Sequence, residues 1–372
     1  MRRLGLVLVS TLLAVIGAVP AHASTHVAVA RPLPPVEPPP TVTAESWILY
    51  DESWGAVLGS FDADEPRAMA STTKIMTGLV AIENLTPGLE VEISERAAGV
   101  GEAEVGLVPG EVLPVDQLIT ALLVRSANDA ALAVAEAIGG SVEGFVRMMN
   151  DRAAELGLEQ TSFANPHGLD ADGHHTSARD LLRLTVAAME TPTFAERVAT
   201  RRFRLPDAPD GTERIAEATN RLLFDDPGAI GVKTGFTARA GLVLVAAAER
   251  DGRMLYAVVM GSDPPGGHFA DATALLDHGF EDFRMLELVM EGSSTPDPLD
   301  GLDTGQGALA REAAAHALVH LGAAGLLGIE APETEPVEEP ESEPPPTATT
   351  TPPLPGPGEV LRWFFGEDSD GG

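Results

Sequence analysis

The sequence predicts an α+β fold, an antiparallel sheet flanked by helices, and three observations lead to this prediction. Apolar segments suited to strands surround a turn near residue 53, two more surround a turn near residue 251, and the segments between these pairs have helical periodicity. Strands first, helices in the middle and strands last are typical of an arrangement in which the terminal strands share one antiparallel sheet.

Each expected hairpin consists of two apolar segments joined by a short polar turn. Asp251-Gly252 between two apolar segments is a strong hairpin signal, because glycine tolerates the positive φ that tight turns need. The expected strands are 47–51 and 56–61 in the first hairpin and 240–249 and 254–261 in the second. A helix from about Phe269 to Phe283 would then cover the shared sheet.

Helical periodicity fills the middle of the chain. A proline at 114 is suited to the first turn of a helix, and Thr176 to Asp180 resembles a capping box before an apolar segment. The expected helices run from Ser71 to about Asn84, from Pro114 through Val124, from Asp129 to Ile138, and onward from Leu181.

The composition excludes several kinds of protein. The 372 residues include 24 Lys and Arg against 56 Asp and Glu, for a formal net charge of −32, and contain no cysteine. The chain therefore has no disulfide, thiolate metal site or cysteine nucleophile. Because nucleic-acid binding needs clustered cations, nucleic acid is not expected as a partner. No cofactor or metal is indicated, since His316 and His320 lack a third ligand.

The N-terminal region differs from the expected folded body. Arg2 and Arg3, the apolar stretch 4–19 and the small residues before Ser24 are typical of an export signal over residues 1–23. An uncleaved anchor is the alternative. Residues 24–43 form a proline-rich linker, and the folded body is expected over residues 44–285. We therefore expect a secreted, extracytoplasmic protein.

The C-terminal region also differs from the body. Residues 286–330 read as a Gly/Ala-rich linker with a surface helix, and residues 331–372 form an acidic, proline-rich tail whose composition predicts disorder. Apolar residues near the end of the tail could touch a membrane, but the carboxylates around them would be repelled by anionic lipids. Membrane contact is therefore left open. These apolar residues are Leu361, Trp363, Phe364 and Phe365.

Lysine occurs only at Lys74 and Lys233, while arginine supplies the other cations. A buried lysine can lose its proton and act as a base, whereas arginine stays charged. Ser71 and Lys74 are three residues apart on a helix, so their side chains can touch. A serine becomes a nucleophile beside such a base, and a helix N-terminus favours negative charge that develops nearby.

Two further motifs follow. Ser126-Ala127-Asn128 lies between two expected helices, where Ser and Asn side chains can donate and accept hydrogen bonds, although an ordinary helix N-cap is the alternative interpretation. Lys233-Thr234-Gly235 ends an expected strand, and alternation puts its lysine and glycine on one side. The missing side chain at Gly235 admits a ligand backbone, and the lysine with the threonine hydroxyl is suited to hold a carboxylate.

The order Ser-x-x-Lys, Ser-x-Asn, Lys-Thr-Gly is the signature set of penicillin-binding proteins and serine β-lactamases. The segments AMASTTKIMT, LLVRSANDAA, FANPHGLD, GHHTSARDL and GVKTGFTARAGLVLVAAAERDG resemble the low-molecular-mass penicillin-binding proteins that are D-alanyl-D-alanine carboxypeptidases. The resemblance covers about Ala44 to Phe283. It implies a penicillin-binding serine peptidase domain over residues 44–285, with a β-lactamase/transpeptidase-like sheet and an adjoining helical lobe.

The resemblance also implies roles for the motif residues. Ser71 would be the acylated nucleophile and Lys74 the base that activates it. Ser126 and Asn128 would relay protons and hold the substrate amide. The terminal carboxylate would be bound by Lys233 and Thr234 beside Gly235, and the oxyanion hole would be the N–H groups of Ser71 and Phe236. The segment Asn165 to Gly168, with His174 and His175, is expected to be structural.

The activity implied is removal of the terminal D-Ala from peptidoglycan pentapeptide stems during cell-wall biosynthesis, a step linked to cell shape, with β-lactams as covalent inhibitors. An endopeptidase that cuts peptide cross-links would use the same residues. A non-catalytic protein that binds muropeptides or β-lactams is the alternative outside the enzymes, although all three motifs are intact. A class A β-lactamase would need a Glu-x-x-Leu-Asn element, which is absent between Asn128 and Lys233.

Overall fold

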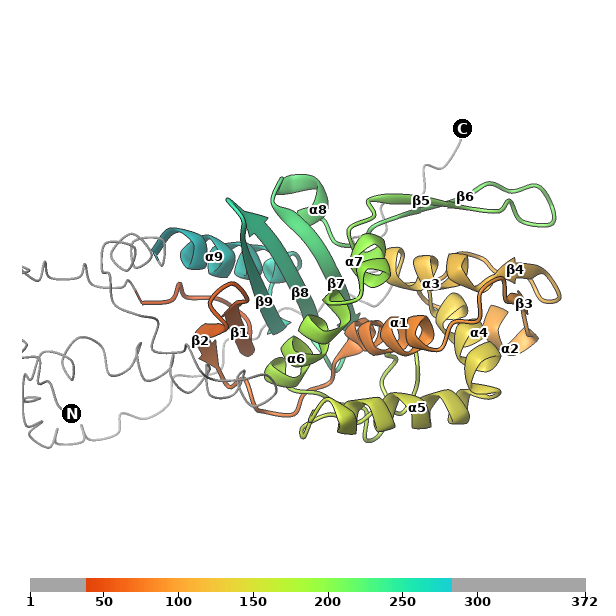
Figure 1. Cartoon of the computed structure of the whole chain (residues 1–372), viewed down its shortest axis with the longest axis horizontal. Helices are drawn as coiled ribbons and strands as arrows, with labels where there is room; N and C mark the ends of the chain where they lie inside the picture. The colour runs from red at the N-terminus through yellow and green to blue at the C-terminus, as the bar shows by residue number, and fades with distance from the viewer. Residues whose placement is uncertain (1–37, 283–372) are drawn as a thin grey trace, which may run out of the picture. The chain divides into compact units, whose positions relative to one another are not determined.

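The computed structural model describes residues 38–282 and confirms the α+β prediction (Figure 1). Five antiparallel strands form the main sheet in the order β2-β1-β9-β8-β7. The two ends of the described region therefore build the sheet, as the pattern of strands and helices predicts. The strands are β1 (Ser46–Asp51), β2 (Ala56–Phe61), β7 (Ala229–Thr237), β8 (Gly241–Arg250) and β9 (Arg253–Ser262).

Both expected hairpins are confirmed, and their strands begin and end within one residue of the predicted positions. The turn between β8 and β9 has Asp251 at φ 54° and Gly252 at φ 78°. Two successive residues of positive φ make the tight turn that suits the right-handed twist of a hairpin. Strand β1 then pairs with β9, with Leu49 opposite Ala257, and this pairing joins the two hairpins into one sheet.

One face of the sheet is covered by α9 (Gly267–Asp282), close to the predicted 269–283. Its packing against the strands is close at Gly279, where an added Cβ would lie 2.3 Å from the Leu255 side chain. Apolar side chains that alternate along β8 and β9 fill this interface, among them Leu244, Ala246 and Val259. The side chains between them in these strands point to the other face of the sheet, where they pack against α1 and the helices around it.

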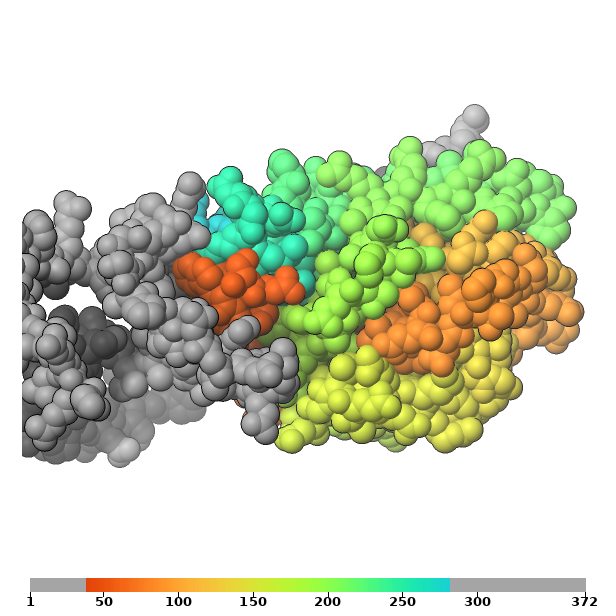
Figure 2. Space-filling model, in the orientation of Figure 1, coloured from red at the N-terminus to blue at the C-terminus, as the bar shows by residue number. Residues whose placement is uncertain are grey.

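The helical lobe is built around α1, from Lys74 to Glu83, which is buried along nearly its whole length. Gly78 permits this position, because an added Cβ would lie 2.9 Å from Leu123 and 3.2 Å from Phe194. On the face in Figure 2, α6 and α7 (light green) lie between the sheet and the rest of the lobe. The other helices are α2 (Glu95–Ala98), α3 (Val115–Val124), α4 (Asn128–Gly139), α5 (Val142–Glu155), α6 (Ala178–Met189), α7 (Pro192–Val198) and α8 (Leu222–Asp225).

Helix starts agree with the sequence signals in most places. The helix α3 begins directly after Pro114, and the Ser177 hydroxyl accepts a hydrogen bond from the Asp180 N–H at the start of α6. The predicted capping box is only half formed, because the Asp180 carboxylate binds Gln160 N and Thr161 Oγ1 instead. The helix α5 and the short helices α2, α7 and α8 have no counterpart in the prediction.

Two small two-stranded antiparallel sheets extend the helical lobe. Strands β3 (Glu90–Glu92) and β4 (Val112–Pro114), with α2 between them in the sequence, form one, and the hairpin of β5 (Arg202–Leu205) and β6 (Arg214–Glu217) forms the other. A buried, two-pronged ion pair between Arg214 and Glu111, at 2.9 Å for both bonds, fastens β6 to the segment that leads into β4. The β5–β6 hairpin is thereby fixed to the loop beside the Ser126 motif.

Several sequence predictions lie outside the described residues. They are the export signal 1–23, most of the linker 24–43, the segment 286–330 and the acidic tail 331–372. Among the helices of residues 38–282, none combines the length and the apolar character that crossing a membrane requires.

Candidate active site

Ser71 lies in a short 3₁₀ turn, Ala70–Thr73, that leads directly into α1. The turn begins with Ala70 at φ 48°. It is fixed by the hydroxyls of Thr72 and Thr73, which donate to Met69 O and Ala70 O at 2.5 and 2.7 Å. The sequence predicts an α-helix from Ser71, whereas its first turn is tighter, and this turn holds the Ser71 side chain over Lys74.

The Lys74 side chain is fully buried, and its Nζ atom lies close to three oxygen atoms. These are Ser71 Oγ at 3.0 Å, Asn128 Oδ1 at 2.7 Å and the His167 carbonyl oxygen at 2.5 Å. The amide and carbonyl oxygens only accept, so they take both protons of a neutral amine. The lone pair of that amine is then left to face the Ser71 hydroxyl.

The pKa of Lys74 is lowered well below the ordinary 10.5, chiefly because burial destabilises the ammonium and secondly because Lys233 is nearby. Asp129 and Glu102 act in the opposite direction. The shift favours the neutral amine, which is the form that can accept a proton from Ser71.

Asn128 begins α4 and is held by three contacts. Its Oδ1 accepts from Lys74, its Nδ2 donates to Gly101 O at 3.1 Å, and its main-chain N–H donates to Ala103 O at 2.6 Å. This side chain therefore orients Lys74, which is a role additional to the one that the sequence predicts, as a ligand for the substrate amide.

Asp129 braces the loop that faces Asn128. Its buried carboxylate accepts hydrogen bonds from the N–H groups of Val105, Leu107 and Ala130. Burial nevertheless raises the pKa of this carboxyl, and the N–H groups partly offset the shift. The sequence prediction treats Asp129 only as the first residue of a helix and gives no role to its side chain.

Ser126 and Lys233 form a second pair across the site. Lys233 Nζ donates to Ser126 Oγ at 2.9 Å and to Thr234 O at 2.9 Å. Ser126 itself has φ 67°, a left-handed conformation that turns the chain between α3 and α4. Burial lowers the pKa of Lys233 from 10.5 to about 7.

Gly235 brings β7 against the nucleophile. A Cβ added at Gly235 would lie 3.0 Å from Ser71 N, so any side chain would press on that N–H group. Thr234 and Phe236 flank this contact on β7, which is an edge strand of the sheet. The structure thus brings the Lys-Thr-Gly segment, the Ser126 motif and the Ser71 motif together.

The segment Asn165 to Gly168 takes part in the site, in contrast to the purely structural role predicted. Its main chain supplies the His167 carbonyl to Lys74 and the Pro166 carbonyl to the Thr77 hydroxyl. A Cβ added at Gly168 would lie 2.1 Å from Ala70 O. A main-chain acceptor has no side-chain signature, so residue types alone do not reveal it.

His174 fastens this segment to the nucleophile turn. Its Nδ1 accepts from Ala164 N at 3.0 Å, so a neutral ring carries its proton on Nε2 and donates it to Thr73 Oγ1 at 2.8 Å. Burial lowers the pKa of His174 to about 4, which keeps the ring neutral. This arrangement is the structural role that the sequence predicts for His174.

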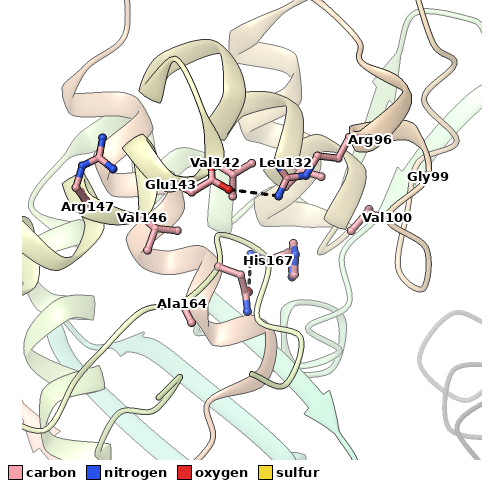
Figure 3. Close-up of a pocket in the computed structure, with 11 residues that line it drawn as sticks. Arg96, Gly99, Val100, Leu132, Val142, Glu143, Val146, Arg147, Ala164 and His167 are labelled. Carbon is pink, nitrogen blue, oxygen red and sulfur yellow. Dashed lines mark hydrogen bonds and ion pairs between the residues drawn. The ribbon is translucent and has the colours of Figure 1, made fainter. Parts of the chain in front are cut away.

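A cavity of about 610 Å³ lies on the lobe beside this segment (Figure 3). Arg96, Glu143 and Arg147 are on its rim, and Leu132, Val142 and Val146 supply apolar wall. His167 belongs both to the site and to the cavity, since its main-chain carbonyl accepts a hydrogen bond from Lys74 and His167 also lines the cavity. The sequence analysis does not anticipate this cavity.

Comparison with known families decides the identity of the fold. Residues 34–264 match the family described as D-alanyl-D-alanine carboxypeptidase. The chain belongs to this family. Within the D-alanyl-D-alanine carboxypeptidases, it is 37% identical over 246 residues to DacF of Bacillus subtilis, and the match covers 65% of this chain and 63% of DacF.

The chain is also similar to other relatives and to solved structures. DacD of Escherichia coli is 35% identical over 267 residues, which are 68% of this chain and 67% of DacD. The crystal structure of the Streptomyces K15 DD-transpeptidase matches with a TM-score of 0.62 and 31% identity, and the match covers 66% of this chain and 99% of that one. The chain therefore spans about two thirds of DacF and DacD and nearly all of the K15 enzyme.

Proposed function

We propose that this chain is an exported serine D-Ala-D-Ala carboxypeptidase that removes the terminal D-Ala from peptidoglycan stem peptides through an acyl-enzyme on Ser71. One observation carries the proposal most directly. Lys74 Nζ lies 3.0 Å from Ser71 Oγ while two fixed oxygens accept its protons. A serine beside a neutral, buried amine is the arrangement that nucleophilic catalysis requires.

In the first step the Ser71 hydroxyl oxygen attacks the carbonyl between the two D-Ala residues, and Lys74 takes the hydroxyl proton. The oxyanion is stabilised by the N–H groups of Ser71 and Phe236. The bond to the terminal D-Ala breaks, and its nitrogen takes the hydroxyl proton of Ser126, which Lys233 hydrogen-bonds. The proton that Lys74 took from Ser71 replaces it on Ser126, so that Lys74 is a neutral amine again.

The second step releases the product. A water molecule gives a proton to Lys74 and attacks the ester carbon on Ser71. Lys74 then passes this proton to the Ser71 oxygen as the ester bond breaks, so that the serine hydroxyl is regenerated and the shortened peptide leaves. Asn128 holds Lys74 throughout and keeps an Nδ2 proton for the substrate amide. Lys233 and Thr234 bind the terminal carboxylate, and the same contacts admit the carboxylate of a penicillin, which acylates Ser71.

Location and partners complete the proposal. The signal-like segment 1–23 supports export, and a pentapeptide stem in the cell wall supplies the D-Ala-D-Ala end. Transpeptidation is a second candidate, because the matched K15 DD-transpeptidase is covered over 99% of its length. An endopeptidase that cuts cross-links would use the same groups.

The test is incubation of the mature protein with a pentapeptide that ends in D-Ala-D-Ala, followed by mass spectrometry. Release of free D-Ala is expected, together with covalent attachment of a labelled penicillin to Ser71. The Ser71→Ala variant is the matched control and should do neither. Undiminished labelling of this variant contradicts the assignment of the nucleophile.

The same incubation separates the alternatives. Adding glycine as an amine acceptor would give a new peptide product if transpeptidation dominates. A cross-linked dimer that is cut while the pentapeptide stays intact would identify an endopeptidase. Penicillin binding without cleavage of either substrate would identify a binding protein.

A further inference from the structure

Outside the three motifs, one buried hydroxyl lies directly against the strand that carries Lys233 and Thr234. Thr219 is 6% exposed, and its Oγ1 lies 2.7 Å from Thr234 Oγ1. We infer that Thr219 is a positioning residue that directs the Thr234 hydroxyl toward the substrate's terminal carboxylate and so favours carboxylate-bearing ligands. This inference rests on the proposed function.

The main chain around Thr219 is fixed on both sides. Its N–H donates to Val124 O at 3.2 Å, two residues before Ser126, and the next side chain, Asn220, accepts from Leu222 N at 3.2 Å. Thr219 thus links the turn that holds Ser126 to strand β7. Because both neighbours are held, the Thr219 hydroxyl stays at Thr234.

Counting protons shows what this contact does. Within residues 38–282, the only hydrogen-bond partner of each of these two hydroxyls is the other hydroxyl. If Thr234 donates, the Thr219 proton is buried without an acceptor, which is unfavourable. If Thr219 donates, the proton of Thr234 is left for a ligand.

A ligand carboxylate therefore selects one direction for the chain, from Thr219 to Thr234 to the carboxylate oxygen. A hydroxyl that accepts a hydrogen bond becomes a better donor, since hydrogen bonds in a chain polarise one another. Lys233 supplies the positive charge, and the Thr219–Thr234 pair supplies the direction. A ligand without a carboxylate gains nothing from this pair.

The experiment compares two thioesters of the same acyl-D-alanine. One has a thioglycolate leaving group with a free carboxylate, and the other has the methyl ester of that group. For Thr219→Val, which keeps the shape and removes the hydroxyl, we expect KM for the carboxylate substrate to rise about tenfold with kcat unchanged. Turnover of the methyl ester should stay within about twofold, and Thr219→Ser should restore the KM.

Thr185→Val is the matched control, because it also removes a buried threonine hydroxyl, one that donates to Leu181 O inside α6. It should change neither substrate's KM. A double-mutant cycle adds a second readout, since Thr234→Val combined with Thr219→Val should lose no more than Thr234→Val alone if Thr219 acts through Thr234.

The outcomes separate the two levels of the proposal. If the wild-type protein turns over neither thioester, the proposed function fails. If the wild type is active and folded Thr219→Val affects both thioesters equally or affects neither, the Thr219 inference is overturned. Should circular dichroism show that Thr219→Val is unfolded, Thr219→Ala replaces it in the same comparison.

Discussion

The nitrogen atoms of Lys74 and Lys233 differ in what surrounds them. Both side chains are fully buried, and burial is the largest cause of the lowered pKa in each. Lys74 faces an amide oxygen and a main-chain carbonyl that take its protons and leave a lone pair for Ser71. Lys233 has a hydroxyl and a carbonyl as partners, and a substrate carboxylate would stabilise its ammonium form.

Replacing Lys74 by arginine should abolish the base while it keeps a cation. A guanidinium has a pKa above ~12 and cannot take the Ser71 proton near neutral pH. We expect Lys74→Arg to lose the ~10²–10⁴-fold that a positioned general base supplies. The measurement is the rate of penicillin acylation, with circular dichroism as a check on folding. Near-normal acylation by a folded variant would show that the base lies elsewhere.

Lys233 should cause kcat/KM to fall on the alkaline side of its pH profile, and this fall is called the alkaline limb. With a pKa of about 7 it loses its proton as pH rises above 7, so the carboxylate loses its ammonium partner. We expect kcat/KM for the carboxylate thioester to fall about tenfold per pH unit above that pKa, since kcat/KM reports groups of the free enzyme. The methyl ester should lack this limb. Lys233→Arg stays charged and should remove the limb, and its persistence in that variant would contradict the assignment.

Sequence reasoning finds the residues whose side chains form a motif and misses those that act through the main chain or alone. Ser71, Lys74, Ser126 and Lys233 are recognised because their spacing and residue types are specific. The His167 carbonyl is not recognised, since every residue type has a main-chain carbonyl and the side chain gives no sign of its role. Thr219 is missed because a lone threonine in a loop has no pattern around it.

At the scale of elements, the segment 164–170 packs against the nucleophile turn, Ala70–Thr73. Gly168 has φ 95° and lies against the Ala70 carbonyl and Ser71 N. At the far end of the segment, Thr237 donates to the Asp170 carboxylate at 2.8 Å and connects it to the end of β7. The segment therefore contacts both elements that carry the reacting groups.

Gly168→Ala should damage both stability and acylation. An added Cβ would lie 2.1 Å from Ala70 O and 2.9 Å from Ser71 N, so the nucleophile turn must shift. We expect a loss of about 2–5 kcal/mol from the positive φ and the overpacking together, and at least a tenfold (about 1.4 kcal/mol) slower acylation.

Gly173→Ala is the control for this variant. Gly173 also has positive φ, at 75°, but an added Cβ meets no atom within 4 Å. It should cost only the ~1–2 kcal/mol of the left-handed backbone and leave acylation intact. Chemical denaturation and the acylation rate measure the two effects. Equal losses in the two variants would show that contact with Ser71 does not matter.

Element prediction succeeds where the pattern is long. The two large hairpins and α9 are predicted nearly to the residue, because six to sixteen residues of consistent periodicity define each. The two-stranded sheets β3–β4 and β5–β6 are missed, since strands of three or four residues are too short to show alternation. The second of them is held by the buried Arg214–Glu111 pair, a contact that the sequence does not reveal.

At the scale of the whole molecule, three histidines of the described region, His167, His174 and His268, destabilise the fold in acid. Burial lowers the pKa of His167 to about 3 and those of His174 and His268 to about 4. In the unfolded chain each would have a pKa near 6.5 and would bind a proton as pH falls below it. The unfolded state then holds more protons than the folded state, so stability is lost as pH falls from 6.5 toward 4.

We therefore expect the melting temperature to fall steadily between pH 7 and pH 5. At pH 5, which is 1.5 units below the unfolded pKa, the cost is on the order of 2 kcal/mol for each histidine. His268→Gln does not titrate and should make the fall smaller than in the wild type. Thermal unfolding followed by circular dichroism across this range is the measurement. A flat profile would contradict the neutral state of these rings.

The pairing of β1 with β9 has a consequence for the order in which the chain is made. Leu49 leaves the ribosome early, while Ala257, which lies opposite it, is synthesised near the end of the body. Until β9 exists, β1 and β2 are an isolated hairpin, which is at most marginally stable in water. Contacts this distant in sequence also fold slowly. The nascent chain thus remains without its sheet until β7, β8 and β9 are made, and the nucleophile turn has no β7 to pack against until then.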